Sequence, residues 1–413
     1  MNYNKSEEEK ERERLETPLT FEITSAGNIV WKAIYASYGA YTVTLEYSKD
    51  SGQNWAQITS NTGSSAPSIA VSAGDTVQFR CGSDSGYATM SSGSSYYNTF
   101  SGTTAGFKVK GNIMSLLSKE NFATADTLQS AYTFCYLFEG CTGLTDASKL
   151  VLPPTILAYG CYFNMFNGCT SLTSLTTAPE LPATTLAEYC YGYMFQGCTG
   201  LTSAPELPAT TLAQGCYTYM FQGCTSLITA PALPATTLAS SCYSYMFYNC
   251  TSLTTAPELP ATTLVSYCYS YMFNGCTSLT TAPELQVTTL AEGCYANMFR
   301  ECTSLITAPA LPATTLASYC YSYMFYGCTS LTTAPELPAT TLASGCYQGM
   351  FSGCSHLNYI KAMFTTTPSY SYTGSWVSGV ASSGTFVKNS AATWDVSGVN
   401  GIPTGWTVQT ATS

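Results

Sequence analysis

From residue 175 onward, hydrophobic and polar positions recur with a period of 26 residues, almost unchanged between copies. Each copy runs from an alternating Leu-Thr-Thr-Ala-Pro segment, through Leu-Pro-Ala-Thr-Thr-Leu, to a segment bounded by two cysteines. A fixed period of this length is typical of a solenoid, in which stacked repeats bury a continuous core and present long, regular surfaces. The second cysteine marks the period, at Cys198, Cys224, Cys250, Cys276, Cys302, Cys328 and Cys354.

The pattern within one repeat predicts a strand followed by a helical segment. Leu and Ala alternate across Leu-Thr-Thr-Ala-Pro, which predicts a short strand that ends at Pro because Pro cannot donate to a ladder. Stacked strands lie about 4.8 Å apart, so eight or nine repeats predict a ribbon roughly 40 Å long. The cysteine-bounded segment predicts one or two helical turns, with Asn249 or a glycine near their end, where a positive φ is favoured. The glycines are Gly197, Gly223, Gly275 and Gly327.

The first part of the chain has a different pattern. Residues 1–16 are a charged segment, which predicts either a solvated tail or a short attachment or oligomerisation helix. Residues 17–110 contain period-2 stretches separated by Gly, Ser and Asn clusters, which predict an antiparallel β-sandwich. Within it, Ser48–Trp55 resembles an Asp-box, in which Asp50 and Gly52 stabilise a hairpin turn.

Three segments complete the predicted organisation. Residues 111–134 have apolar positions at helical spacing and predict a cap over the N-terminal end of the solenoid. Residues 135–354 predict the solenoid itself, with Cys135 out of register and a three-residue insertion near Ser174. Residues 355–413 are rich in aromatic residues and glycine turns and predict a C-terminal cap. The fold class is therefore mixed β/α, a β-sandwich followed by a repeat solenoid.

Composition excludes several functions. Only 9% of residues are charged, and between residues 175 and 354 there are eight Glu and one basic residue, Arg300. This lack of basic charge argues against nucleic-acid binding. The single histidine, His356, argues against zinc chemistry and histidine-based acyl transfer. No apolar run is long enough for membrane insertion, and the charged start lacks the apolar region of a secretory signal.

Two columns of side chains are the candidate binding positions. Tyrosines recur in pairs two residues apart, and neighbours at this spacing on a helix point to different sides. One tyrosine of each pair is therefore expected to form an exposed stripe able to stack against sugar rings or to anchor a protein, although it could equally cover the solenoid edge. We assign this column to Tyr193, Tyr219, Tyr245, Tyr271 and Tyr323.

Glutamates form the second column. They occupy one repeat position, which is Ala232 or Ala310 in two copies. Stacked carboxylates repel, so a cation, a basic partner or solvent screening is expected to relieve them. We assign this column to Glu180, Glu206, Glu258, Glu284 and Glu336.

The remaining repeated residues are expected to be structural. Paired Met and Phe residues, such as Met272 and Phe273, are expected to lie in the core, and nothing indicates a cofactor. The 19 cysteines leave three alternatives, namely buried free thiols, disulfides within or between repeats, and metal sites. A glycan-active enzyme would need a distinct carboxylate pair or nucleophile. The acids of the array are repeated rather than singular, so we predict that the protein is not an enzyme.

The repeat resembles the BspA-like leucine-rich repeats of gut Bacteroides and related bacteria. The resemblance is carried by Phe-x-Gly-Cys-Thr-Ser-Leu, which reads FQGCTGL at Phe195–Leu201 and FQGCTSL at Phe221–Leu227, and it covers roughly residues 134–360. It implies a right-handed solenoid and a surface protein for adhesion or recognition, often of host matrix, other microbes or glycans. Members normally carry a secretory signal or lipid anchor, and the charged start departs from that pattern.

The flanking segments resemble proteins of Bacteroides phages and prophages. PLTFEI, YSKDSGQNW and GNIMSLL before the array and GTFVKNSAATW and GIPTGWTV after it carry this resemblance. It implies a virion fibre-type protein that binds a bacterial surface glycan or protein receptor and contacts other virion proteins, with a homo-oligomer as one of its expected states. A fibre protein assembles in the bacterial cytoplasm and needs no signal. The alternative is a bacterial cell-surface adhesin for host matrix, mucin or glycans.

Overall fold

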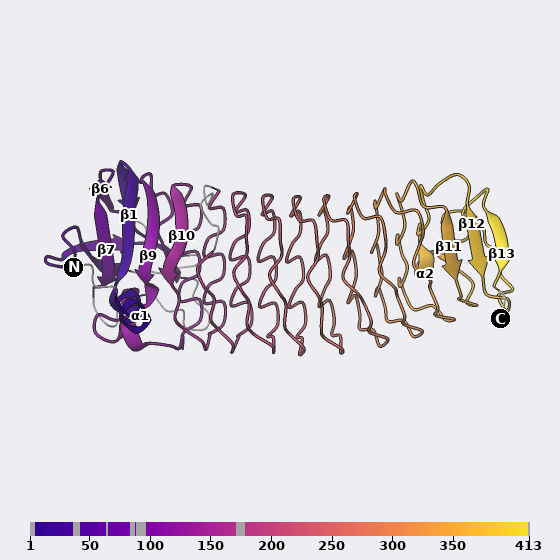
Figure 1. The fold of residues 1–413 in the computed structure, drawn as a ribbon, viewed down its shortest axis with the longest axis horizontal. Helices are drawn as coiled ribbons and strands as arrows, with labels where there is room; N and C mark the ends of the chain where they lie inside the picture. The colour runs from indigo at the N-terminus through magenta and orange to yellow at the C-terminus, as the bar shows by residue number, and fades with distance from the viewer. Residues whose placement is uncertain are drawn as a thin grey trace. The chain divides into compact units, whose positions relative to one another are not determined.

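A computed structural model gives the fold of the chain in two compact units, Met1–Ala209 and Thr210–Ser413. The first is the N-terminal unit and the second is the C-terminal unit (Figure 1). The structure describes residues 5–35, 42–62, 65–82, 87, 96–170 and 178–411. None of the helices in these ranges is long and apolar enough to cross a membrane.

A six-stranded sheet organises the N-terminal unit, in the order β10-β9-β1-β7-β4-β5. Figure 1 shows β10, β9, β1 and β7 side by side. All neighbours are antiparallel except β9 and β10, which are parallel. The strands are β1 (Leu19–Ser25), β4 (Thr42–Ser48), β5 (Ala56–Asn61), β7 (Thr76–Cys81), β9 (Gly106–Asn112) and β10 (Leu144–Val151). Two shorter antiparallel ladders pair β2 (Gly27–Val30) with β6 (Ser68–Val71), and β3 (Lys32–Tyr35) with β8 (Tyr96–Thr99).

Alternating residues of these strands build an aromatic core. Phe21 of β1 is fully buried and stacks on Phe107 of β9, with ring centroids 4.6 Å apart. Phe100 lies 4.8 Å from both Phe21 and Trp31, so it joins the large sheet to the segment that follows β2. The β pattern predicted for residues 17–110 thus corresponds to real strands. The sheet also extends beyond that range, because β10 adds a parallel strand. That these strands form a β-sandwich stays a prediction.

Helical structure is limited to short elements. The charged segment contains α1 (Glu7–Glu16), which begins with a capping box between Ser6 and Glu9 and buries none of its residues. Residues 111–134 form two 3₁₀ turns, η1 (Ile113–Leu116) and η2 (Phe122–Thr124), instead of a regular helix. The reason is that the buried run is only four residues long and is capped by the Asn112 side chain, which accepts from the Met114 N–H.

The predicted helical turns of the repeats are wrong. In the C-terminal unit, alternate backbone N–H groups donate to the carbonyl three residues earlier, as Met246 does to Tyr243 at 3.2 Å. The intervening N–H groups donate to the next repeat, as Tyr245 does to Ser270 at 2.9 Å. Because half of the donors bond to the neighbouring repeat, no α-helix can form. Each cysteine-bounded segment is instead a chain of turns, which we call a coil segment.

A left-handed residue at every fourth position closes these turns. In one coil segment these residues are Ser241, Tyr245 and Asn249, with φ of 53°, 58° and 57°. The third position holds the glycines that the sequence places at a positive φ, including Gly275 at 74° and Gly327 at 70°. The four-residue spacing is therefore a property of the coil segment, and the sequence meets it with Gly, Asn, Ser or Tyr.

The predicted repeat strands are reduced to single bridges. Thr255 forms isolated parallel bridges to Thr229 and to Thr281, and no longer ladder joins them. The proline two residues later in each copy lacks an N–H and stops the ladder. Three parallel strands occur only after the regular repeats, namely β11 (Tyr359–Ala362), β12 (Thr385–Lys388) and β13 (Thr407–Thr410), with α2 (Tyr370–Thr373) before β12. The fold is thus mostly β, with few helices, rather than mixed β/α.

The coil path continues beyond the last regular cysteine. The N–H of Phe351 donates to the carbonyl of Trp376 at 2.8 Å, the same type of bond that joins earlier coil segments. Trp376 is fully buried, and Trp394 and Trp406 are nearly so. The segment expected to be a C-terminal cap is therefore built partly as further turns of the same path, with tryptophans filling its interior.

Identical side chains stack on one another in the interior of the C-terminal unit. Phe247 and Phe273 lie 5.6 Å apart and nearly parallel, and Tyr243 and Tyr269 lie 5.8 Å apart. Paired Met residues, such as Met272, are fully buried beside them. The expectation that Met and Phe are core residues is confirmed.

All 19 cysteines are buried free thiols. Of the three alternatives of free thiols, disulfides and metal sites, the structure has the free thiols. The second cysteine of a coil segment donates an S–H hydrogen bond to a phenylalanine carbonyl of the preceding repeat, as Cys276 does to Phe247 at 3.1 Å. Burial raises the pKa of the Cys276 thiol to about 12. These thiols are therefore protonated donors and packing groups, not nucleophiles.

Candidate binding face

The first tyrosine of each pair is buried and the second lies at the surface. In the C-terminal unit Tyr243 and Tyr269 are 1% exposed, whereas Tyr219, Tyr245 and Tyr271 are half-buried. The half-buried rings form a continuous stack, with centroids 4.3 Å apart and interplanar angles of 11° and 8°. Burial and the neighbouring phenols raise the pKa of Tyr245, so its hydroxyl stays protonated.

The other two assigned tyrosines have different surroundings. Tyr323 is half-buried at the same coil position, but Asn297 stands between it and Tyr271 in the order of repeats. Tyr193 belongs to the N-terminal unit, where its ring meets Phe163 edge-on at 5.1 Å. We call the outward face of the C-terminal unit that bears Tyr219, Tyr245, Tyr271 and Tyr323 the tyrosine face.

A second set of exposed tyrosines, which sequence reasoning missed, borders the tyrosine face. Tyr267 and Tyr319 are 38% and 42% exposed and precede the first cysteine of their coil segments. A Cβ added at Gly293 would lie 2.3 Å from the Tyr267 ring, and one at Gly345 would lie equally close to Tyr319. Each ring therefore covers the glycine of the next repeat. The signal in the sequence is the alternation of Tyr and Gly at this position.

A hollow of about 470 Å³ lies between these two sets of tyrosines. Tyr245 and Tyr271 of the first set and Tyr267 and Tyr319 of the second line it, and the side chains lining it include no charged group. Serines lie between them, and their hydroxyls donate to carbonyls of the next repeat, as Ser270 does to Ala296 at 3.3 Å. The hollow thus combines aromatic rings with neutral polar groups.

The glutamate column does not form one acidic site. In the N-terminal unit, Glu180 pairs with Arg14 of α1 at 2.7 Å, and Glu206 is exposed. In the C-terminal unit, Glu336 pairs with Lys361 of β11 at 2.9 Å. The chain itself thus supplies basic partners for two of the five carboxylates. Within the described residues, no group of three or more side chains is arranged to hold a metal ion.

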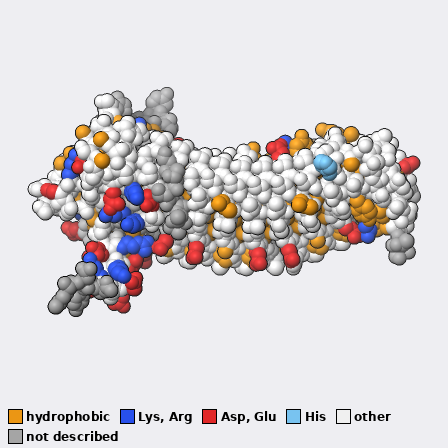
Figure 2. All heavy atoms as spheres, turned by 45° about the horizontal axis from the view of Figure 1, so that its top comes forward, with side chains coloured by type: hydrophobic (Ala, Val, Ile, Leu, Met, Phe, Trp, Pro, Cys, Tyr) orange, Lys and Arg blue, Asp and Glu red, His pale blue; other side chains and the backbone are white. Residues whose placement is uncertain are grey.

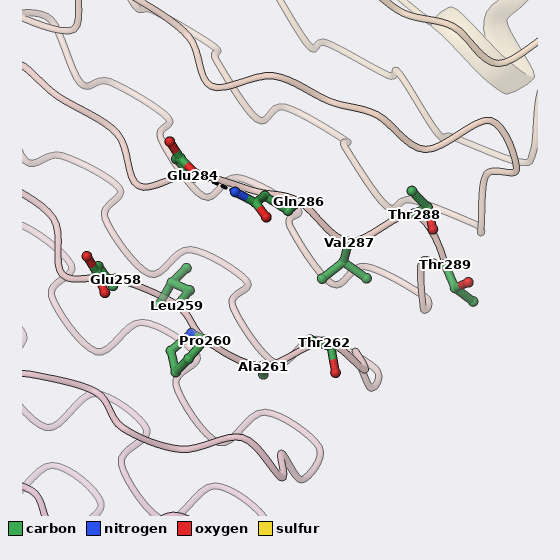
Figure 3. A pocket seen from close by; sticks show the side chains of 10 residues that line it. All are labelled: Glu258, Leu259, Pro260, Ala261, Thr262, Glu284, Gln286, Val287, Thr288 and Thr289. Carbon is green, nitrogen blue, oxygen red and sulfur yellow. Dashed lines mark hydrogen bonds between the residues drawn. The ribbon is translucent and has the colours of Figure 1, made fainter.

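Glu258 and Glu284 come from successive repeats and line a hollow of about 580 Å³ (Figure 3). Gln286 donates to the Glu284 carboxylate, and Pro260 and Val287 form part of the wall. Neither carboxylate is buried, and both side chains are exposed to solvent. The arrangement lacks the desolvated acid expected of a general acid in glycoside hydrolysis.

Charge is distributed unevenly over the surface (Figure 2). Blue and red side chains gather in one part of the visible surface, whereas much of the remainder is white with scattered orange and red. This agrees with the eight Glu and the single basic residue Arg300 between residues 175 and 354. A surface so poor in positive charge gives no electrostatic footprint for nucleic acid.

The Asp-box is a hairpin device and not a catalytic one. Asp50 accepts from the Asn54 backbone N–H at 2.9 Å and from the Ser48 hydroxyl at 2.7 Å. These bonds lower the pKa of Asp50 to about 2. Gly52 has a φ of 86°, and Trp55 donates to its carbonyl. The Asp50 carboxylate is thus used within the turn between β4 and β5.

Comparison with known proteins places the repeats in context. A family model described as the BspA type leucine rich repeat region matches in six copies, over residues 118–230, 162–306 and 283–380. Together these matches run from residue 118 to residue 380, which is more than half of the chain. No curated protein matches the chain significantly.

Proposed function

The chain belongs to the BspA-type leucine-rich repeat family, and from this premise we propose that it is a non-enzymatic recognition protein of a phage virion. It would bind a bacterial surface receptor through its repeat array, as a fibre-type protein does. Repeats of this family suit binding or adhesion, and their regular surfaces present the same groups many times. The localisation would be the virion, with other virion proteins as further partners.

The observation that carries the binding role is the tyrosine face. Its rings are half-buried, three of them are stacked, and the side chains that line the hollow beside them are uncharged. Tyrosine supplies a large, rigid contact area with a polar tip, which is why it is frequent at binding surfaces. A surface with these properties favours a glycan or a protein receptor over a charged polymer.

Two observations favour the fibre setting over a cell-surface adhesin. The segments flanking the array resemble those of Bacteroides phages, and the array contains long identical stretches, such as Ser226–Ser240 and Ser304–Ser318. Because equivalent side chains stack on each other inside the C-terminal unit, a repeat can be gained or lost without changing the interior contacts. Such an array can vary by recombination while its receptor varies.

The binding role is tested with the fluorescently labelled chain on a panel of gut Bacteroides strains, with mucin and epithelial cells alongside. We expect strain-selective labelling that weakens at least tenfold in Tyr245→Ala/Tyr271→Ala. The control Ile306→Ala removes another exposed large side chain, 62% exposed, and should label normally. Equal labelling by the tyrosine variant and the wild type would refute the role of this face.

The fibre setting needs a separate measurement. Mass spectrometry of purified phage particles should detect the protein together with the capsid and tail proteins. Its absence from particles, combined with labelling of mucin or epithelial cells and not of bacteria, would instead support the alternative of a bacterial surface adhesin for host matrix, mucin or glycans.

A further inference from the structure

One repeat of the C-terminal unit, Leu279–Ser304, keeps the stacked core of its neighbours but differs from them beside it. Its core positions keep the common residues, with Tyr295, Met298 and Phe299 all at most 2% exposed. The changes are at Ala296 and Asn297, which are 6% and 5% exposed, and at Arg300 and Glu301 nearer the surface, where other repeats carry mainly Ser or Thr, Tyr, Gln or Tyr, and Gly. The stacked core therefore does not account for these substitutions.

Surface hollows gather at the same repeat. The hollow of about 470 Å³ beside the tyrosine face includes Ala296 and Asn297. The hollow of about 580 Å³ includes Gln286 and Val287, which replace the usual Pro-Ala pair (Figure 3). A third, of about 610 Å³, includes Thr280 and Gln286. The repeat that departs from the common sequence is thus also one where the surface is indented.

Asn297 leaves a vacant place in the tyrosine column. A tyrosine here would continue the stack of Tyr245 and Tyr271 toward Tyr323, but asparagine is much shorter. Two repeat spacings separate Tyr271 from Tyr323, roughly 9–10 Å, so a ring inserted midway would lie within stacking distance of both. Asn297 is 5% exposed and lines the hollow, and its side-chain oxygen has no hydrogen-bond partner among the described residues.

The tyrosines around this slot are held in an unfavourable backbone conformation. Tyr267, Tyr271, Tyr319 and Tyr323 have φ between 54° and 57°, where a side chain costs about 1–2 kcal/mol relative to glycine. Glycine occupies the same positions elsewhere, at Gly293, Gly345 and Gly349, so the fold does not require tyrosine there. Every coil segment needs a left-handed residue at these positions, so a tyrosine there adds strain that a glycine would avoid.

We propose that the slot at Asn297 binds one ring of a neutral sugar and selects the receptor glycan. Tyr271 and Tyr323 would stack against its two faces, and the Asn297 carboxamide would bond a ring hydroxyl. Neutral sugar suits the hollow because its lining is uncharged and the charges near it are of both signs, with Glu292 bonded to the Tyr267 hydroxyl at 2.9 Å and Arg300 5.9 Å from the centre of the Tyr323 ring. This inference rests on the proposed function and narrows it to one repeat and one ligand class.

The test is Asn297→Tyr. It fills the slot with a tyrosine, the residue found at this position in other repeats as Tyr245 and Tyr271. The matched control is Gln222→Tyr, which adds a tyrosine three repeats away, where Tyr248 and Tyr326 occupy the same position in other repeats. Both variants should unfold thermally like the wild type. Binding is measured by calorimetry with dextran, mannan and galactan as neutral probes and polygalacturonate as an acidic probe, and by labelling of the strain panel.

We expect the wild-type chain to bind at least one neutral probe. Asn297→Tyr should weaken both that binding and the labelling of strains at least tenfold, whereas Gln222→Tyr should bind and label like the wild type. Equal strain labelling by Asn297→Tyr and wild type would overturn the slot while leaving the recognition function standing. Labelling that depends on Asn297 but is abolished by protease treatment of the cells, with no neutral probe bound, would overturn the sugar assignment in favour of a protein receptor. A wild-type chain that labels nothing would remove the recognition function itself.

Discussion

The inward and outward positions of the coil segments follow different rules. Inward positions repeat the same residues with little change, so Cys, Tyr, Met and Phe form columns that are almost entirely buried. Outward positions vary, and the segment Cys294–Cys302 varies most while keeping its interior. Packing fixes the inward residues because each must fit against its own copy in the next repeat. The outward residues are free to change, so differences there carry information about binding.

Alkaline pH should affect the inward positions most strongly. Burial raises the pKa of Cys276 to about 12, against about 8.5 for an exposed thiol. The native state therefore holds these protons more tightly, so the stability that the thiols contribute is present below pH 8.5 and is lost as pH rises toward 12. Each thiol contributes up to about 1.4 kcal/mol per pH unit in that window, and many thiols act together.

Circular dichroism during a pH titration measures this loss. We expect a constant free energy of unfolding between pH 6 and 8, cooperative unfolding above about pH 9, and no reaction with a thiol reagent at pH 8 until urea is added. Rapid modification of the thiols in the folded protein would contradict the interior that we describe.

A pair of alanine variants compares the two kinds of position directly. Phe273 is fully buried and stacked between Phe247 and Phe299, at 5.6 and 5.7 Å. Phe273→Ala should lower the free energy of unfolding by about 3–5 kcal/mol. Tyr271→Ala, two residues earlier and half-buried, should lower it by about 1 kcal/mol or less, because its ring leaves only a partly buried stack. Urea unfolding measures the free energy of unfolding of both variants. Equal losses would contradict the difference between inward and outward positions.

The contact between Tyr267 and Gly293 offers a test at the boundary of the two kinds of position. Gly293→Ala places a Cβ 2.3 Å from the Tyr267 ring at a φ of 56° and should cost about 1–3 kcal/mol. In the background of Tyr267→Ala the steric part of that cost should disappear. A double-mutant cycle by urea unfolding measures this coupling. Additive effects would show that the ring does not lie over the glycine.

The glutamate column should have the smallest effect. The Glu336–Lys361 pair is 2.9 Å long, and its carboxylate side chain is 52% exposed. Glu336→Gln should change the free energy of unfolding by less than about 1 kcal/mol, and raising the salt concentration should reduce the difference further. Thermal unfolding at low and high salt checks this. A larger, salt-independent loss would indicate a structural role for the column.

Much of the array was predictable from the sequence because period and burial depend on side chains. The Met-Phe core and the positive φ of Gly275 and Gly327 follow from residue type and spacing. The helical prediction was wrong because buried residues recur every four positions, as Cys294, Met298 and Cys302 do, and this spacing is close to the period of a helix. Only the hydrogen bonds between repeats distinguish a coil segment from a helix, and these bonds cannot be read from the sequence.

The candidate site was predictable only in part, for a similar reason. The outward tyrosines are visible in the sequence, but their contact with the glycines of the next repeat depends on which residues the fold brings into register. Asn297 is visible as a departure from the common repeat. That it leaves a slot between two rings follows only from the stack formed by Tyr245 and Tyr271.

The backbone bonds between coil segments all run in the same direction, which gives the array an electrical polarity. Tyr243 donates to the Cys268 carbonyl, and Tyr269 donates to that of Cys294, each at 3.1 Å. The peptide groups between these cysteines and tyrosines therefore align head to tail through the C-terminal unit, as they do along an α-helix, and their dipoles add. The positive end of the summed dipole lies at the last coil segments. An anion is therefore stabilised there and a cation at the opposite end of the unit, and adding repeats moves these two ends further apart.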